Sequence, residues 1–264
     1  MKRFLNQYKL NIICSFAAIA LIIVCWIIAY YAVGNDYVVP SFQDTLKSFF
    51  VCFGEGAFWV AFLFTLLRTA IAFLISFVLA ALCAVAAAFS KVFKLFIQPF
   101  ITVMRTLPTL AVILLLLVWT NAKAAPVIVT VLLLFPMIYV QIYAAISGVD
   151  KDVLQMADFY NVNKKDKLFK IYLPQISPAV FAQVGANVSL GLKVMISAEV
   201  LSNTYKSLGG LMQSARSFLE MPRLAALTLM AVILGLIFEI AFAQLKRINS
   251  KWQKGGCYED RKPL

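Results

Sequence analysis

The chain has 264 residues, of which 62% are hydrophobic and 14% are charged, and its mean hydropathy is +0.88. This composition lies outside that of soluble domains and predicts an integral membrane protein. The net charge of +12 does not indicate a nucleic-acid partner, because the Lys and Arg residues punctuate hydrophobic runs. With no histidine and no CxxC or metal-ligand spacing among five cysteines, we expect neither a metal nor a cofactor.

Six hydrophobic segments are long enough to cross a bilayer, whose core of about 30 Å needs roughly 20 helical residues. The first follows Lys2, Arg3 and Lys9 and is too long for a cleavable signal sequence, so we interpret it as a retained span. The expected spans are 10–33, 61–89, 95–120, 124–147, 177–200 and 224–245. The sequence therefore predicts an all-α membrane protein, with residues 1–264 forming a single transmembrane domain of about six helices.

The loop after the first span has its own helical pattern. Leu46, Phe49, Phe50 and Phe53 recur at i, i+3, i+4 and i+7, and Ser41 is well placed to cap the helix that carries them. We therefore predict a short amphipathic helix at the outer surface.

Prolines are expected to bend two of the later segments and to begin a third. The third carries Pro99 and Pro108 with Arg105 between them, which predicts a kink, because proline removes a helical hydrogen bond. Pro136 predicts a bend inside the fourth segment. The fifth is expected to begin at Ser177 and Pro178.

The distribution of positive charge predicts the orientation. With the N-terminus inside, sixteen Lys and Arg residues fall in cytoplasmic segments and five fall outside. The five outer residues are Lys47, Lys123, Lys206, Arg216 and Arg223. Both termini and the polar loop at 148–176 are therefore expected on the cytoplasmic side.

The loop at 148–176 is predicted to fold into two short helices. Asp150 can cap the first, in which Val153, Ala157 and Tyr160 share an apolar face. Asn161 should interrupt it, because asparagine accepts the left-handed backbone conformation. Asn163 then starts the second helix, which Pro174 should end.

This loop resembles the EAA loop of bacterial ABC importer permeases, in which a Glu-Ala-Ala triplet precedes a glycine and a distal Ile-x-Leu-Pro. Here 155–157 reads Gln-Met-Ala, Asn161 stands at the glycine, and Ile171, Leu173 and Pro174 match the end with the same spacing. Gln155, Met156 and Asn161 depart from the pattern. Because the usual glutamate is absent, we expect shape and apolar contacts to carry the coupling.

The resemblance extends over most of the chain and points to the nitrate/sulfonate/taurine branch of these permeases. The matching stretches are Val39-Pro40-Ser41, 65–68 (Thr-Leu-Leu-Arg), 104–108 (Met-Arg-Thr-Leu-Pro), 192–200 (Leu-Lys-Val-Met-Ile-Ser-Ala-Glu-Val) and 207–212 (Ser-Leu-Gly-Gly-Leu-Met). Each is weak alone, but their order and spacing together identify the family.

Membership would imply a type I importer fold in the bacterial inner membrane, with both termini inside. The implied partners are ATP-binding cassette ATPase subunits, an extracytoplasmic solute-binding protein, a second permease copy and membrane lipid. The implied ATPase-coupling residues are Val153, Gln155, Met156, Ala157, Tyr160, Asn161, Ile171, Leu173 and Pro174. The solute would be small and anionic in character, such as nitrate, a sulfonate, taurine or a thiamine precursor.

Three charged residues in hydrophobic segments are candidates for the solute path, because charges in a membrane usually face protein or water. Lys193 would meet an anionic solute, or it pairs structurally with Glu239. Arg105 lines the path or extends its side chain to the interface. Glu199 lines the path or forms a structural interaction near the outer gate.

The leading hypothesis is thus a permease subunit that is not itself an enzyme. The chain carries no Walker A pattern, HExxH or GxSxG, so ATP hydrolysis would belong to a partner subunit. The alternative is an ion-gradient-driven secondary transporter or channel, for which internal repeats would be typical; none is evident between the two halves.

Overall fold

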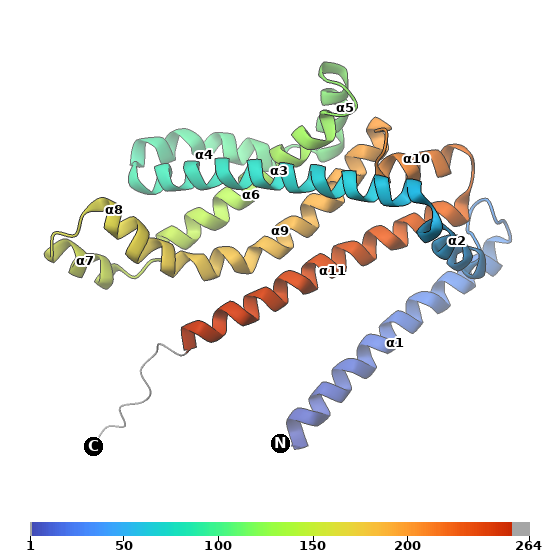
Figure 1. Ribbon diagram of the computed structural model, residues 1–264, viewed down its shortest axis with the longest axis horizontal. Helices are drawn as coiled ribbons and strands as arrows, with labels where there is room; N and C mark the ends of the chain where they lie inside the picture. The colour runs from blue at the N-terminus through green and yellow to red at the C-terminus, as the bar shows by residue number, and fades with distance from the viewer. Residues whose placement is uncertain (1, 255–264) are drawn as a thin grey trace.

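The computed structural model describes residues 2–254, and in that range every regular element is helical. In chain order the elements are α1 (Lys2–Val33), α2 (Phe42–Gly54), α3 (Gly56–Phe89), α4 (Lys91–Thr106), α5 (Thr109–Trp119), α6 (Ala125–Ser147), α7 (Lys151–Phe159), α8 (Lys164–Asp166), the π-helical turn η1 (Lys167–Tyr172), α9 (Leu173–Ser202), α10 (Leu208–Ser217) and α11 (Met221–Lys254) (Figure 1). Arg261 and Lys262 of the expected cationic tail lie outside the described residues.

Among the described residues, four helices are long and apolar enough to cross a membrane: α3, α6, α9 together with η1, and α11. The bent pair α4 and α5 makes a fifth span if it is counted as one. The described part of α1 adds a shorter apolar helix, Ala20–Val33. An all-helical membrane fold is confirmed, with four or five spans identified by length and composition where the sequence predicted about six.

The two ends of the molecule are distinct. In Figure 1, α7 and α8 lie at one end, and α2 and α10 lie at the other. The start of α1 and the end of α11 both point away from α2 and α10, toward the side of α7 and α8. This arrangement agrees with the predicted orientation, in which both termini and the 148–176 loop share the cytoplasmic side.

The bundle core is built by small side chains. Every fourth residue of α3 from Ala72 to Ala84 is buried, and each is alanine or serine, whereas Leu74 and Leu82 on the outer face are 59% and 64% exposed. Small residues let helix backbones approach closely in a membrane, and the large outward side chains face lipid. The close partner of α3 is α6, which in turn packs on α9, and α9 packs on α11.

A pair of amides joins α6 to α9 inside the bundle. Gln141 Nε2 donates to Asn187 Oδ1 at 3.2 Å, and Asn187 Nδ2 donates back to Gln141 Oε1 at 2.7 Å. Each amide satisfies the other where water is scarce, and such interhelical bonds contribute about 0.6–2 kcal/mol. The pair therefore fixes the axial register of two central helices.

The third segment breaks where the sequence predicted a kink. Helix α4 ends at Thr106, α5 begins at Thr109, and the two axes differ by 99°. Leu107 is extended (φ −65°, ψ 128°), because a residue before proline is pushed out of the helical region. The break is at Pro108, while Pro99 lies inside α4.

The fifth segment differs from its prediction. Pro174 does not end the second loop helix and Pro178 does not begin the span, because η1 continues directly into α9. The Leu173 N–H donates to the Leu168 carbonyl, five residues back. This wider turn makes room for a proline ring that would otherwise clash with the carbonyl four residues before it. The second half of the 148–176 loop is therefore continuous with α9.

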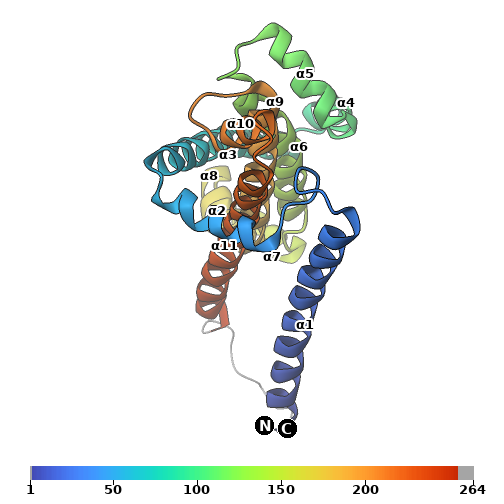
Figure 2. The same ribbon diagram turned by 90° about the vertical axis from the view of Figure 1, so that its right-hand side faces the viewer.

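The predicted short helix after the first span is confirmed as α2. The Ser41 hydroxyl accepts a hydrogen bond from the Asp44 N–H at 3.1 Å, which is the expected N-cap. Helix α2 packs on α11, and Cys52 is buried in their contact. Figure 2 shows α1 standing apart from the bundle; its Trp26 Nε1 donates to the Pro40 carbonyl at 3.1 Å.

Candidate coupling loop and solute path

The first loop helix, α7, begins and ends as its sequence predicts. The Asp150 carboxylate accepts from the Asp152 N–H at 2.9 Å and caps the N-terminus. At the other end Asn161 is left-handed (φ 51°), its N–H donates to the Asp158 carbonyl at 3.0 Å, and Val162 N–H donates to the Ala157 carbonyl at 2.9 Å. These two bonds form a Schellman motif, which ends the helix and turns the chain. Asn161 thus supplies the conformation that glycine has in the family pattern.

The predicted apolar face of α7 is divided between the chain's own interior and solvent. Ala157 is buried at 6% exposure and Val153 is half-buried, so both pack inside the protein. Tyr160, by contrast, is 73% exposed, Met156 is 62% exposed, and Phe159 is 83% exposed. Met156, Phe159 and Tyr160 therefore form the exposed tip of the loop, which we call the apolar tip.

Phe159 was missed by the sequence reasoning because it lies outside the Val153 stripe. Its signal was its spacing: it follows Met156 by three residues and adjoins Tyr160, against whose ring it packs edge to face at 5.6 Å.

The second half of the loop anchors the first. Lys167 forms an ion pair with Asp158 at the end of α7. Ile171 packs against the main core cluster, and the Tyr172 ring meets Phe89 of α3 at 5.7 Å. Leu173 and Pro174 remain exposed at the start of α9. The second half of the loop thus contacts α3 and continues into α9.

Near the outer end of α9, a buried ion pair joins three segments. Glu199 is fully buried, and its carboxylate accepts from Arg68 Nη1 at 3.0 Å and from Thr65 Oγ1 at 2.8 Å, both on α3. The Gly209 N–H of α10 approaches it at 3.4 Å. These contacts fit the structural interaction that is one of the two interpretations of Glu199, and its role in the solute path stays a prediction. Arg68 also donates to the Lys206 carbonyl at 3.4 Å.

Gly209 and Gly210 serve packing rather than a turn. Both lie in the first turn of α10, and neither has a positive φ. A Cβ on Gly209 would lie 2.4 Å from Glu199 Cβ, and one on Gly210 would lie 2.3 Å from the Thr204 carbonyl oxygen. Glycine is required because α10 begins against the end of α9.

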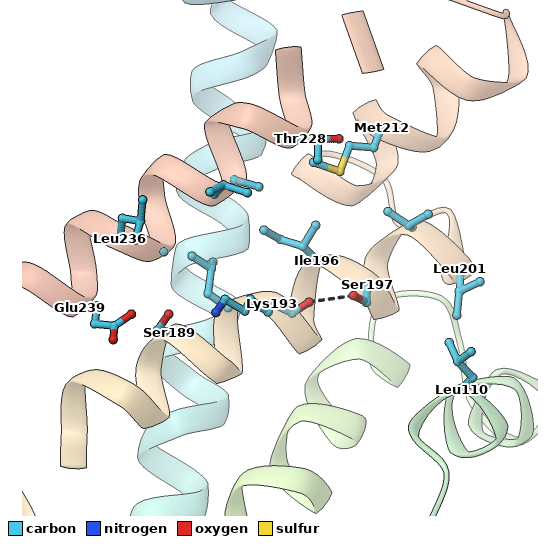
Figure 3. Close-up of a pocket in the computed structure, with 15 residues that line it drawn as sticks. Leu110, Ser189, Lys193, Ile196, Ser197, Leu201, Met212, Thr228, Leu236 and Glu239 are labelled. Atoms are coloured by element: carbon cyan, nitrogen blue, oxygen red, sulfur yellow. Dashed lines mark hydrogen bonds between the residues drawn. The ribbon is translucent and has the colours of Figure 1, made fainter. Parts of the chain in front are cut away.

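A cavity of about 570 Å³ lies between α9 and α11 (Figure 3). Lys193 lines it from α9 and Glu239 lines it from α11, while the path role of Lys193 stays a prediction. Among the described residues the two form no ion pair within 4 Å. Arg105 lies elsewhere, exposed near the end of α4. The structure thus brings Lys193 to a cavity and places Arg105 and Glu199 outside it.

Comparison with known proteins agrees with this architecture. Residues 76–251 match the family described as binding-protein-dependent transport system inner membrane component. The chain is 29% identical over 219 residues to a protein of Escherichia coli (strain K12) named as the aliphatic sulfonates transport permease SsuC, covering 81% of this chain and 82% of that protein. It is 21% identical over 238 residues to the taurine transport system permease protein TauC of the same organism, covering 88% and 86%.

Two solved structures share the fold. One is an amino acid ABC transporter with histidines (TM-score 0.60, 20% identity, 70% of this chain and 90% of that chain). The other is a bacterial alginate ABC transporter in complex with a periplasmic protein bound to alginate pentasaccharide (TM-score 0.65, 14% identity, 89% and 94%). Fold, loop and comparisons define an inner-membrane permease subunit of the ABC importer class. The chain belongs to the family of inner-membrane components of binding-protein-dependent transport systems.

Proposed function

We propose that this permease subunit carries a small organic anion of the sulfonate type and is driven by a separate ATPase that docks on the 148–176 loop. The names of the two Escherichia coli relatives support the solute class. Lys193 in the cavity between α9 and α11 supports it independently, because a cation there attracts an acidic group.

The apolar tip is the observation that carries the ATPase contact. Met156, Phe159 and Tyr160 are 62%, 83% and 73% exposed on a polar loop that lies at one end of the molecule. Large exposed apolar side chains rimmed by polar residues indicate a protein interface. An ATPase groove that accepts the tip would move α9 with it, because Lys167 of η1 pairs with Asp158 of α7 and η1 continues directly into α9. ATP-driven closure would thus reach the solute path as a rigid-body motion.

A second copy of the chain and an extracytoplasmic solute-binding protein complete the proposed assembly. Arg105 is exposed on a helix in a hydrophobic segment, where a charge needs a protein or aqueous neighbour rather than lipid. A homodimer would supply that neighbour. The binding protein would dock at the opposite end from the apolar tip, where α2 and α10 lie.

The test is to co-express the full chain with its ATPase and to compare Phe159→Asp and Met156→Asp with Lys165→Ala. Lys165 is exposed on the same loop and is interpreted as a topology signal, so it is the matched control. Loss of a buried aromatic anchor costs about 2 kcal/mol or more at an interface, so ATPase co-purification should fall roughly 30-fold. Solute-stimulated hydrolysis should fall with it. Unchanged co-purification and stimulation in both Asp variants would refute the docking role.

A further inference from the structure

Helix α2 has an apolar face that the bundle does not use. Thr45 and Cys52, seven residues apart, are buried on the side of α2 that packs against α11. Leu46, Phe50 and Phe53 follow one another at i, i+4 and i+7, so they share a different side of the helix. They are 45%, 66% and 41% exposed. One side of α2 is therefore covered by the chain itself, while a second, apolar side is left open.

Charged groups border a third side of α2. Lys47 and Glu55 line a pocket of about 370 Å³ together with Glu220 and Arg223, which lie at the start of α11. Arg223 pairs with Glu55 at 2.5 Å and with Glu220 at 3.6 Å. These ion pairs and the buried Cys52 fasten α2 to the first turns of α11. The polar groups of this region thus gather away from the apolar face.

The apolar face of α2 continues into the outward surface of α3. The Phe53 and Trp59 rings lie 5.7 Å apart, and Trp59 Nε1 donates to the Phe53 carbonyl at 2.9 Å. From Trp59 an exposed stripe runs along α3 through Leu63 and Leu67, which are 65% and 53% exposed. Large outward side chains on a membrane span face lipid. The open face of α2 therefore adjoins a lipid-facing surface.

The length of α3 places α2 at the depth of the lipid headgroups. The 34 residues of α3 rise about 51 Å at 1.5 Å per residue, whereas the hydrocarbon core is about 30 Å thick. A centred α3 thus extends about 10 Å beyond the core at each end. One residue separates α2 from α3, and Figure 2 shows α2 lying across the direction of α11. Helix α2 is therefore positioned along the bilayer surface.

We propose that the partner of the Leu46, Phe50 and Phe53 face is the outer leaflet of the bilayer, and that α2 thereby holds the start of α11 at the headgroup layer. An interfacial helix buries its apolar face about 5–10 Å into the boundary between headgroups and acyl chains, and aromatic rings are favoured there. The charged pocket on the third side then faces water. The inference goes beyond the proposed function and does not rest on it.

The test compares two adjacent residues that are equally exposed but point in different directions. Phe50 and Val51 are 66% and 62% exposed and lie about 100° apart around the helix, and Val51 lines the charged pocket. Each is replaced by tryptophan in the full chain, with all four native tryptophans changed to phenylalanine, in phosphatidylcholine nanodiscs. Lipids brominated at different acyl positions quench according to depth, and acrylamide quenches from water. Phe50→Trp should lie about 5–10 Å deeper than Val51→Trp, which acrylamide should quench more strongly.

Two further measurements keep the proposal testable if either tryptophan variant fails to fold. Native Trp59, in a chain whose other three tryptophans are phenylalanine, should be quenched by brominated lipid, because it adjoins the same face. Hydrogen exchange in the first turns of α11 should quicken roughly tenfold in Phe50→Ser, the factor that loss of one large apolar side chain from lipid supports. Val51→Ser is the matched control and should leave this exchange unchanged. The melting temperature shows that each variant is folded.

The outcomes that would overturn the lipid anchor are distinct. Acrylamide quenching of Phe50→Trp as strong as that of Val51→Trp would place the face in water. Shielding of Phe50→Trp from both quenchers would place it against a second copy of the chain. Equal exchange in Phe50→Ser and Val51→Ser would overturn the role of α2 in holding α11. None of these measurements depends on the ATPase or the solute, so this proposal and the proposed function can fail separately.

Discussion

The buried pair of Arg68 and Glu199 gives the most quantitative prediction. Arg68→Met keeps a long apolar stem but leaves a fully buried carboxylate without its counter-charge. Removing one partner of a buried ion pair costs about 3–5 kcal/mol. The Thr65 hydroxyl and the Gly209 N–H remain as donors to the carboxylate, so we expect a loss near the lower end, about 3 kcal/mol.

The reverse substitution should cost less. Glu199→Gln keeps the shape and one acceptor oxygen, while Arg68, whose side chain is 17% exposed, retains contacts with the carbonyls of Lys206 and Tyr205. We expect about 1–3 kcal/mol for this change. In the double variant Arg68→Met with Glu199→Gln, no charge is left unmatched. Its cost should therefore fall at least about 1 kcal/mol short of the sum of the single losses.

The assay is reversible unfolding of the full chain in mixed micelles, followed by helical circular dichroism, with the double-mutant cycle completed under one set of conditions. The cycle isolates the pairwise interaction from the separate effects of each side chain. A loss below about 1 kcal/mol for Arg68→Met, or strict additivity of the two single variants, would show that the pair does not hold α3, α9 and α10 together.

Three further predictions follow from local geometry. Gly209→Ala should destabilise the chain by about 1–3 kcal/mol in the same unfolding assay, because the added Cβ would lie 2.4 Å from Glu199 Cβ on α9. The control Gly56→Ala should be neutral, because a Cβ there meets nothing within 4 Å. Equal losses in the two variants would contradict the packing argument. Asn161→Gly should preserve ATPase coupling, because glycine adopts the left-handed conformation freely. Asn161→Val should lower coupling, because a β-branched residue at φ 51° is strained by about 1–2 kcal/mol. Full coupling in the valine variant would count against the left-handed turn. The hydrogen bond from Ser41 is the main cause that lowers the pKa of Asp44, and the hydrogen bond and charge of Lys47 lower it further. The stability that this carboxylate adds to α2 is therefore present above its unfolded pKa and is lost as pH falls through the lower folded pKa. Hydrogen exchange of α2 should therefore quicken on acidification, and Ser41→Ala should reduce that pH dependence; identical pH profiles would refute the role of the cap.

Much of the molecule follows from local sequence chemistry. The Ser41 and Asp150 caps, the left-handed Asn161 and the break at Pro108 each depend on residues within a few positions of one another, and all four occur as predicted. The class of protein was also accessible from the sequence, through hydrophobic segment lengths and the ordered family motifs. Local hydrogen bonding and backbone sterics act over such short ranges that no tertiary contact is needed to anticipate them.

Other features depend on how distant segments meet. Arg68 and Glu199 are 131 positions apart, and only the packing of α3 on α9 shows that their side chains meet in a buried ion pair. Helical periodicity grouped Ala157 with Tyr160 on one apolar face. In the structure Ala157 is buried and Tyr160 is exposed.

From the sequence, Lys193 would either meet an anionic solute or pair structurally with Glu239. The tertiary structure places them in one cavity without pairing them. Sequence alone determined the all-helical class, the caps of α2 and α7, the turn at Asn161 and the break at Pro108, because those properties are local. Which charges meet, which faces are covered and where a cavity remains were decided by helix packing, which depends on side chains brought together from across the whole chain.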